Sequence, residues 1–180
     1  MSLTVWYTMM PSPWGPLCLA ATQEGLLRAD FQQGDRPVRP DPTWQENASP
    51  LADACGQLQE YFQRQRRHFT LRLAPAGTPF QQRVWQELQR IPYGTTITYL
   101  QLAQRLGNPR AVRAVGHANG CNPIAIIIPC HRVIGRDGRL RGYASGLAFK
   151  QSLLQHEGAR LLSPGTRRAA RRFSPGVRAP

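Results

Sequence analysis

Cys130 and His131 are adjacent in the sequence and follow an apolar run, residues 124–128, that Pro129 closes. A thiol beside an imidazole can act as a nucleophile, because a neighbouring histidine lowers the thiol pKa and the thiolate is the reactive form. Such a histidine needs a third group that orients it, and Glu157 can fill that role. Each residue also has an ordinary structural interpretation, since buried cysteines are commonly inert and sequence neighbours often point apart. The spacing alone does not decide between a reactive thiol and a structural cysteine.

The position of Glu157 gives a separate reason to expect a function. It falls in the last turn of a helix predicted over residues 147–157, which Gly158 ends. A carboxylate there opposes the helix dipole by about 0.3–1 kcal/mol. An acid that costs stability at its position calls for a functional explanation.

The four cysteines, Cys18, Cys55, Cys121 and Cys130, form no CxxC pair and show no zinc-ligand spacing. We therefore expect free thiols, no bound metal and no cofactor. The N-terminus shows no basic stretch followed by a long apolar run, and no apolar run in the chain approaches a membrane span of about 20 residues. These features predict a soluble cytoplasmic protein.

The positive charge of the chain is confined to its second half. The net charge is +13, and all basic residues except Lys150 are arginine. Residues 1–87 hold eight arginines and eight acidic residues, whereas residues 88–180 hold fourteen arginines and Lys150 against Asp137 and Glu157. A coding bias toward arginine would explain the abundance but not this asymmetry. A phosphate-rich partner of the second half, such as nucleic acid, would explain both.

Two predicted helices in the second half flank a three-residue G-N-P turn. Thr98 begins the first helix with a capping-box pattern, and Gly107 ends it. Asn108 and Pro109 begin the second helix, which is predicted over residues 110–119. Two helices joined by such a turn are typical of a helix-turn-helix DNA-binding motif.

The second of these helices has a face suited to DNA. Arg110 and Arg113 lie on one side, and the small residues Ala114 and Gly116 keep the helix slim, so that it can approach a phosphate backbone closely. The alternative is a solvated helix face, which is the usual explanation for one charged helix. That interpretation does not account for the turn, the small residues and the charge asymmetry together, so we favour DNA binding.

The remaining pattern predicts an α/β (α+β) fold. A small N-terminal domain of β-sheet plus one helix is followed by a mostly helical C-terminal domain that contains the helix-turn-helix. The expected elements are a β-meander over 3–31, a loop over 34–50, a helix over 51–64, a strand near 69–73, a helix capped at Thr78 and a buried strand at 124–128. The expected domains are residues 1–76 and 77–160, followed by a basic, disordered tail at 161–180.

Three stretches of the second half, "ITYLQLAQRLGNPRAVRAVGHANG", "NPIAIIIPCHRVIG" and "KQSLLQHEG", resemble the O6-alkylguanine-DNA alkyltransferase family, also called methylated-DNA–protein-cysteine methyltransferases. The resemblance covers residues 77–158 strongly and 3–73 more weakly, and it is closest to the stand-alone bacterial form. It implies DNA repair by irreversible transfer of an alkyl group from O6-alkylguanine to an internal cysteine, once per protein molecule, after the damaged base is flipped. It also implies double-stranded DNA as the partner, a monomer, O4-alkylthymine as a candidate second substrate, no membrane and no metal.

The resemblance also implies roles for individual residues. Cys130 is the alkyl acceptor, His131 its water-linked base, and Glu157 the acid that polarises the imidazole. Arg113 is the finger that fills the gap left by the flipped base. Tyr99 rotates a phosphate and bonds guanine N3.

The same resemblance assigns the walls of the base pocket. Asn122 braces the turn beneath it, and Tyr143 lines it. The backbone carbonyls of the acceptor cysteine and of Val133 accept hydrogen bonds from the guanine amino group, and the amide of Ala144 faces O6. Ser145 stands where glycine is common in the family, which affects the room for bulky alkyl groups.

Three other functions are open from the residues alone. A sequence-specific DNA-binding regulator needs the helices and the arginines but not Cys130, His131 and Glu157 together. A cysteine hydrolase with a Cys-His-Glu triad needs turnover but no basic half. A non-catalytic binder of alkylated DNA carries another residue, often tryptophan, in place of the cysteine, and Cys130 argues against it.

Overall fold

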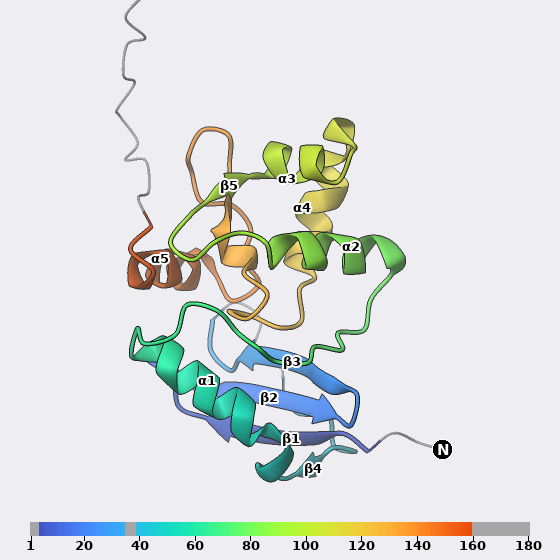
Figure 1. Ribbon diagram of the computed structural model, residues 1–180, viewed down its shortest axis with the longest axis vertical. Helices are drawn as coiled ribbons and strands as arrows, with labels where there is room; N and C mark the ends of the chain where they lie inside the picture. The colour runs from blue at the N-terminus through green and yellow to red at the C-terminus, as the bar shows by residue number, and fades with distance from the viewer. Residues whose placement is uncertain (1–3, 35–38, 160–180) are drawn as a thin grey trace, which may run out of the picture.

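The computed structural model describes residues 4–34 and 39–159. A sheet and one helix from the first part of the chain lie at one end, and the helices of the second half lie at the other (Figure 1). This arrangement confirms the predicted mixed fold. The basic segment 161–180, predicted to be disordered, lies outside the described residues.

The predicted meander is present as three antiparallel strands, β1 (Trp6–Met10), β2 (Leu17–Thr22) and β3 (Gly25–Phe31). A fourth strand, β4 (Gln45–Glu46), pairs in parallel with β1, so the sheet order is β3-β2-β1-β4. The prediction of a loop over residues 34–50 is therefore wrong at these two residues. Both are exposed and polar, so no apolar alternation marks the strand, and backbone hydrogen bonds alone define it.

Helix α1 (Ala52–Phe62) follows a short 3-10 helix, η1 (Ser49–Leu51), close to the predicted helix. Its apolar stripe predicted the packing correctly, because Ala54, Leu58 and Tyr61 are buried in the same core as the leucines of β2. Tyr61 also contributes to the site described below, since its hydroxyl reaches the last helix of the chain.

The free edge of β3 contacts both segments that the sequence predicted as further strands, residues 69–73 and 124–128. Leu26 forms a parallel bridge with the first segment and Ala29 with the second, each at a single residue. The amide of Ala29 also donates to the carbonyl of Pro123 at 2.9 Å, which ties the two halves together. Both strand predictions are wrong, because the two segments share one short edge and neither has a second partner among the described strands.

Residues 124–128 form a buried turn. Ile126 has a φ of 70°, which is rare for a β-branched residue and must be held by its surroundings. The side-chain nitrogen of Asn122 donates to the carbonyl of Ile128 at 2.7 Å, and its oxygen accepts from the amide of Ile124 at 3.0 Å. These isoleucines are buried between the edge of β3 and the helices, and a continuous apolar run does not distinguish that burial from a strand.

The second half consists of helices around a two-stranded parallel sheet of β5 (Ile97–Thr98) and β6 (Val133–Ile134). Helix α2 (Pro79–Leu88) and helix α3 (Tyr99–Arg105) each begin with the predicted capping box, at Thr78 and Thr98. Helix α3, the 3-10 helix η2 (Pro109–Ala111) and helix α4 (Val112–Gly120) form the predicted helix-turn-helix. The 3-10 helix η3 (Cys130–Arg132) and helix α5 (Leu147–His156) complete this half.

Two findings concern the described residues only. None of their helices has both the length and the apolar composition needed to cross a lipid bilayer. No group of three or more His, Cys, Asp or Glu side chains among them is arranged to hold a metal ion.

Candidate active site

Cys130 begins η3 and lines a cavity of about 410 Å³. The residue is only 6% exposed, so a group that reacts with its thiol must enter this cavity. The cavity lies where β3, the end of α4 and residues 142–145 meet. Pro129 and the turn braced by Asn122 fix the cysteine at its wall.

The structure gathers most of the predicted pocket residues here. Asn122, Tyr143, Ala144 and Ser145 line the cavity together with Cys130. Ser145 is buried and Ala144 is exposed.

Val133 is buried in β6 and is not among the lining residues. Tyr99 lines a neighbouring hollow of about 690 Å³ instead. The first half of the chain also contributes to the cysteine cavity, since Arg28 and Asp30 of β3 line it as a hydrogen-bonded ion pair with an Nε–Oδ2 distance of 2.7 Å. The sequence did not predict this contribution.

His131 and Glu157 are paired as predicted. The Nε2 atom of His131 lies 2.8 Å from Oε1 of Glu157, and both side chains are fully buried. Because a carboxylate only accepts hydrogen bonds, Nε2 carries the imidazole proton and Nδ1 presents its lone pair. Nδ1 has no partner among the described residues.

Arg132 and Tyr61 complete the surroundings of Glu157, and the sequence did not predict either of them. The Arg132 guanidinium donates to both carboxylate oxygens at 2.9 Å, and the Tyr61 hydroxyl donates to Oε1 at 2.9 Å. The amide of Gly94 donates to Oε2 at 3.1 Å. These four donors, with His131, offset the unfavourable helix dipole that made Glu157 conspicuous in the sequence.

The network sets the charges of the pair. Burial alone would raise the pKa of the Glu157 carboxyl, but hydrogen bonds and charges from His131 and Arg132 outweigh it and hold the pKa well below its usual range. Burial lowers the pKa of the His131 imidazole, and the bond to Glu157 opposes this only in part. Glu157 is therefore ionised and His131 neutral, with Arg132 supplying the compensating charge.

The thiol of Cys130 differs from the expectation in one respect. No hydrogen bond joins it to the His131 ring among the described residues, since Nε2 bonds Glu157 and Nδ1 is unpartnered. Burial raises the thiol pKa, and the groups that act in the other direction include the Asn122 side chain and the charge of Lys150. The backbone amide of His131 also acts to lower the thiol pKa, whereas a lowering by the imidazole ring stays a prediction.

Lys150 is a buried cation that the sequence interpretation overlooked. Its residue is 0% exposed, and Nζ donates to the carbonyl of Arg141 at 2.7 Å. Burial lowers its pKa from 10.5 to about 8, against an opposing contribution from Cys130. The sequence could have indicated its burial, because Lys150 is the single lysine of the chain and lies on the side of α5 that also holds the buried Leu153 and Leu154.

Tyr99 stands at the start of α3 beside this lysine. Its hydroxyl donates to the same Arg141 carbonyl at 3.0 Å, and Nζ of Lys150 lies 5.7 Å from its ring centroid. Burial, with a further contribution from Cys130, raises the pKa of the Tyr99 hydroxyl to about 12. The hydroxyl therefore keeps its proton at neutral pH.

The outer face of the helix-turn-helix has the predicted polarity. Arg110, Arg113 and Ala114 are exposed, whereas Val115 is buried. Gly116 faces the ring of Tyr99, where an added Cβ would lie 3.8 Å from the ring. The slim helix thus presents its arginines and Ala114 outward, while Gly116 lies against the tyrosine.

Comparisons with known proteins agree with this geometry. The family model of the 6-O-methylguanine DNA methyltransferase DNA-binding domain matches residues 79–159, and that of its ribonuclease-like domain matches residues 5–75. A methylated-DNA–protein-cysteine methyltransferase of Methanosarcina acetivorans is 48% identical over 86% of this chain and 99% of its own length. The chain belongs to the 6-O-methylguanine DNA methyltransferase family.

Solved structures of the family have the same fold. The crystal structure of the Mycobacterium tuberculosis O6-methylguanine methyltransferase is 44% identical, covers 86% of this chain and 93% of its own, and superposes with a TM-score of 0.79. The structure of the M. tuberculosis protein in complex with DNA is also 44% identical, over 85% of this chain and 92% of its own, with a TM-score of 0.78.

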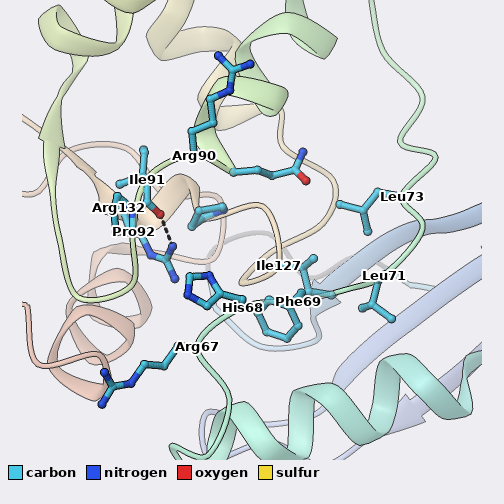
Figure 2. A pocket seen from close by; sticks show the side chains of 12 residues that line it. Arg67, His68, Phe69, Leu71, Leu73, Arg90, Ile91, Pro92, Ile127 and Arg132 are labelled. Atoms are coloured by element: carbon cyan, nitrogen blue, oxygen red, sulfur yellow. Dashed lines mark hydrogen bonds between the residues drawn. The ribbon is translucent and has the colours of Figure 1, made fainter.

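Another cavity of this methyltransferase fold, of about 240 Å³, lies between residues 67–73 and the end of α2. Figure 2 shows Arg132 in it, with a guanidinium nitrogen bonded to the carbonyl of Ile91. Arg67 and His68 extend from the first half of the chain. No cysteine lines this cavity, in contrast to the cavity at Cys130.

Proposed function

We propose that this protein repairs alkylated DNA by moving the alkyl group from O6 of guanine to the Sγ atom of Cys130, once per molecule. The observation that carries the proposal is the buried Cys130 thiol at a cavity wall, backed by the His131–Glu157 pair. Membership of the methyltransferase family supports the activity, and the basic helix-turn-helix half supports DNA as the partner.

Activation of the thiol is the first step of the proposed mechanism. The lone pair of His131 Nδ1 accepts the proton of Cys130 through a water molecule, and Glu157 stabilises the imidazolium that forms. The charge of Lys150 favours the resulting thiolate. Because the thiol is buried, these contributions are needed to offset the desolvation of the anion.

The transfer itself is an in-line displacement. The thiolate forms an S–C bond to the alkyl carbon while the C–O6 bond breaks, and its electron pair goes to the guanine. The Tyr99 hydroxyl, which holds its proton, supplies that proton at N3 once it has left the carbonyl of Arg141. The thioether product has no labile bond, so the protein is used once.

Access to the lesion requires that the base leave the stack. Arg113 is placed to fill the gap, and Arg110 to contact the phosphate backbone, both on the exposed face of the helix-turn-helix. Ala114 on this face and Gly116 beside Tyr99 keep the helix slim enough to enter the minor groove. Flipping costs a few kcal/mol, which the phosphate contacts and the inserted side chain offset.

The residues that line the cysteine cavity bind the flipped base. Tyr143 and Ser145 contact the flipped base, the amide of Ala144 faces O6, and the carbonyls of Cys130 and Val133 accept from its amino group. Residues 77–160 are the catalytic domain, and residues 1–76 support it and complete the cavity through Arg28 and Asp30. The protein acts as a monomer in the cytoplasm, and O4-alkylthymine is a candidate second substrate.

The three alternative functions predict different changes in protein mass and turnover. A transcriptional regulator or a non-catalytic lesion binder gains no mass from alkylated DNA, and a cysteine hydrolase turns over. The deciding experiment is intact-protein mass after mixing with a duplex that contains O6-methylguanine. We expect a gain of one methyl, about 14 Da, located on the Cys130 peptide and saturating at one equivalent. Label on Cys121, or turnover beyond one equivalent, contradicts the proposal.

A further inference from the structure

Residues 135–141 form a hairpin after β6, here called the arginine hairpin. The amide of Gly135 closes it by donating to the carbonyl of Arg139 at 2.9 Å. The hairpin holds one acid and three arginines, all exposed: Asp137, Arg136, Arg139 and Arg141. Three basic residues against one acid leave it with a net charge of +2. The proposed transfer reaction does not use these charges.

The arginine hairpin forms one wall of a groove whose other wall is the helix-turn-helix. The hollow of about 690 Å³ that Tyr99 lines lies between them. The helices contribute Leu100 and Val112, both half-buried, and the hairpin contributes Arg136 and Arg141. Figure 1 shows the hairpin, in orange, at the same end of the molecule as α3 and away from the sheet. Cationic groups beside apolar side chains fit the sugar–phosphate backbone of DNA, which offers anionic phosphates next to apolar sugar faces.

Asp137 takes the place of an anionic ligand within the hairpin. Its Oδ2 atom accepts a hydrogen bond from Nη2 of Arg141 at 2.9 Å, and Nε of Arg139 lies 3.9 Å from the same atom. Ion pairs that are exposed to solvent, as these are, are weak. Arg136 is not a partner of this carboxylate. The hairpin therefore has one guanidinium open to an anion and another held by a weak, exchangeable partner.

The arginine hairpin adjoins the active site through the backbone of Arg141. The carbonyl of Arg141 accepts hydrogen bonds from the Tyr99 hydroxyl at 3.0 Å and from Nζ of Lys150 at 2.7 Å. In the proposed function, Tyr99 gives its proton to the flipped guanine. A DNA strand that lies in the groove beside Tyr99 is therefore the strand that carries the lesion.

We propose that the arginine hairpin is a second DNA-contact surface, in which Arg136 and Arg141 bind phosphates of the lesion strand next to the flipped nucleotide. This inference rests on the proposed function, which decides the strand that lies in the groove. A phosphate replaces Asp137 as the partner of Arg141, because a guanidinium binds phosphate through two parallel hydrogen bonds. The helix-turn-helix and the hairpin then hold the strand from both sides, and Asp137 competes with DNA in the free protein.

The first test measures binding of an undamaged duplex by fluorescence anisotropy over a range of salt concentrations. Arg136→Gln and Arg141→Gln should each weaken binding at low salt by about threefold or more, and reduce the slope of log affinity against log salt by about one. Arg136→Lys, which keeps the charge, should retain the slope. Asp137→Asn, which removes the internal competitor, should strengthen binding by about twofold or more.

Arg90→Gln is the matched control for the loss of one positive charge. The Arg90 side chain is 76% exposed and lies just after α2, at the cavity drawn in Figure 2 and not at the groove. Its substitution should leave the salt slope unchanged. Thermal melting checks that each variant is folded.

The second test identifies the strand, with duplexes that contain O6-methylguanine and one uncharged methylphosphonate linkage. Binding is measured in the Cys130→Ala background, so that the lesion is bound and not repaired. At a lesion-strand linkage beside O6-methylguanine, loss of the charge should weaken binding, and Arg136→Gln should then cause no further loss. Unchanged slopes for both arginine variants, or additive losses at every lesion-strand linkage, overturn the inference. Absence of methyl transfer from O6-methylguanine to the unsubstituted protein overturns the proposed function instead.

Discussion

The Nε2 atom of His131 lies 2.8 Å from the Oε1 atom of Glu157, in a pair whose two side chains are fully buried. The same carboxylate receives two hydrogen bonds from the Arg132 guanidinium. Glu157 thus has two roles that can be separated by experiment. Its charge compensates the buried Arg132 guanidinium, which affects the stability of the fold. Its hydrogen bond orients the His131 imidazole, which affects the rate of methyl transfer.

Substitution of Glu157 by Gln should affect both quantities. It leaves Arg132 buried without a counter-ion, which is expected to lower the free energy of unfolding by about 3–5 kcal/mol. The methyl transfer rate of the folded fraction should fall by about 10- to 100-fold, because the imidazolium loses its stabilising charge. Denaturant unfolding and single-turnover transfer measure the two effects. Glu60→Gln, at a partly exposed ion pair with Arg66, is the matched control and should change stability by about 1 kcal/mol or less.

The acid stability of the protein should depend on the same carboxylate. The folded pKa of Glu157 lies below its unfolded value of about 4.3. Its contribution to stability is therefore fully present above that value and is lost as the pH falls toward the lowered folded pKa. Unfolding followed from pH 7 to pH 2 should show a loss in this window that Glu157→Gln lacks. Equal acid sensitivity of the two proteins would assign the loss to other carboxylates.

Lys150 should lower the stability of the fold and raise the rate of methyl transfer. Its folded pKa of about 8 lies below the ordinary lysine pKa of 10.5, so the charged form costs stability at neutral pH. Stability is regained as the pH rises from about 8 to about 10.5. Lys150→Met should be more stable at pH 7 by about 1–3 kcal/mol, with a gain that shrinks toward pH 10. Its transfer rate should fall and its pH–rate profile should shift upward, because the thiolate loses a favourable charge. Gln151→Met, on the exposed side of α5, should change neither quantity.

Arg113 should matter for flipping and not for the chemistry. Arg113→Ala is expected to slow repair of duplex O6-methylguanine far more than transfer from free O6-benzylguanine, since the free base needs no extrusion. Arg110→Ala, on the same exposed face, should weaken binding of damaged and undamaged duplex alike. Stopped-flow repair and filter binding separate the two effects. Equal losses of Arg113→Ala on duplex and free base would require a structural role for this side chain.

Duplex affinity should decrease steeply with salt, because residues 88–180 carry all of the net charge. We expect a slope of several units in a plot of log affinity against log salt concentration. A chain that ends after Gly158 lacks six arginines, so it should show a smaller slope and retain repair. An affinity independent of salt would argue against phosphate contacts as the main source of binding.

The sequence by itself determined the features that depend on local order and composition. The capping boxes at Thr78 and Thr98, the helix-turn-helix and the position of Cys130 follow from short-range hydrogen bonding, spacing and motif. The charge asymmetry is likewise a property of composition. The pairing of His131 with Glu157 was predictable because a carboxylate at the end of a helix is unfavourable without a partner.

The tertiary structure alone decided which groups from distant segments meet. Residues 124–128 are a turn and not a strand, because only Ile124 bridges β3 and the amide of Ile128 donates back to the carbonyl of Ile124. The apolar run predicted that the segment is buried but not which backbone conformation it has. Tyr61 and Arg132 reach Glu157, and Lys150 and Asn119 reach the surroundings of Cys130, through packing over long sequence distances. A buried polar side chain is specified by partners that the local sequence does not contain. The sequence therefore indicated the nucleophile and its base, while the charges and hydrogen bonds around them arise from the packing of the two halves.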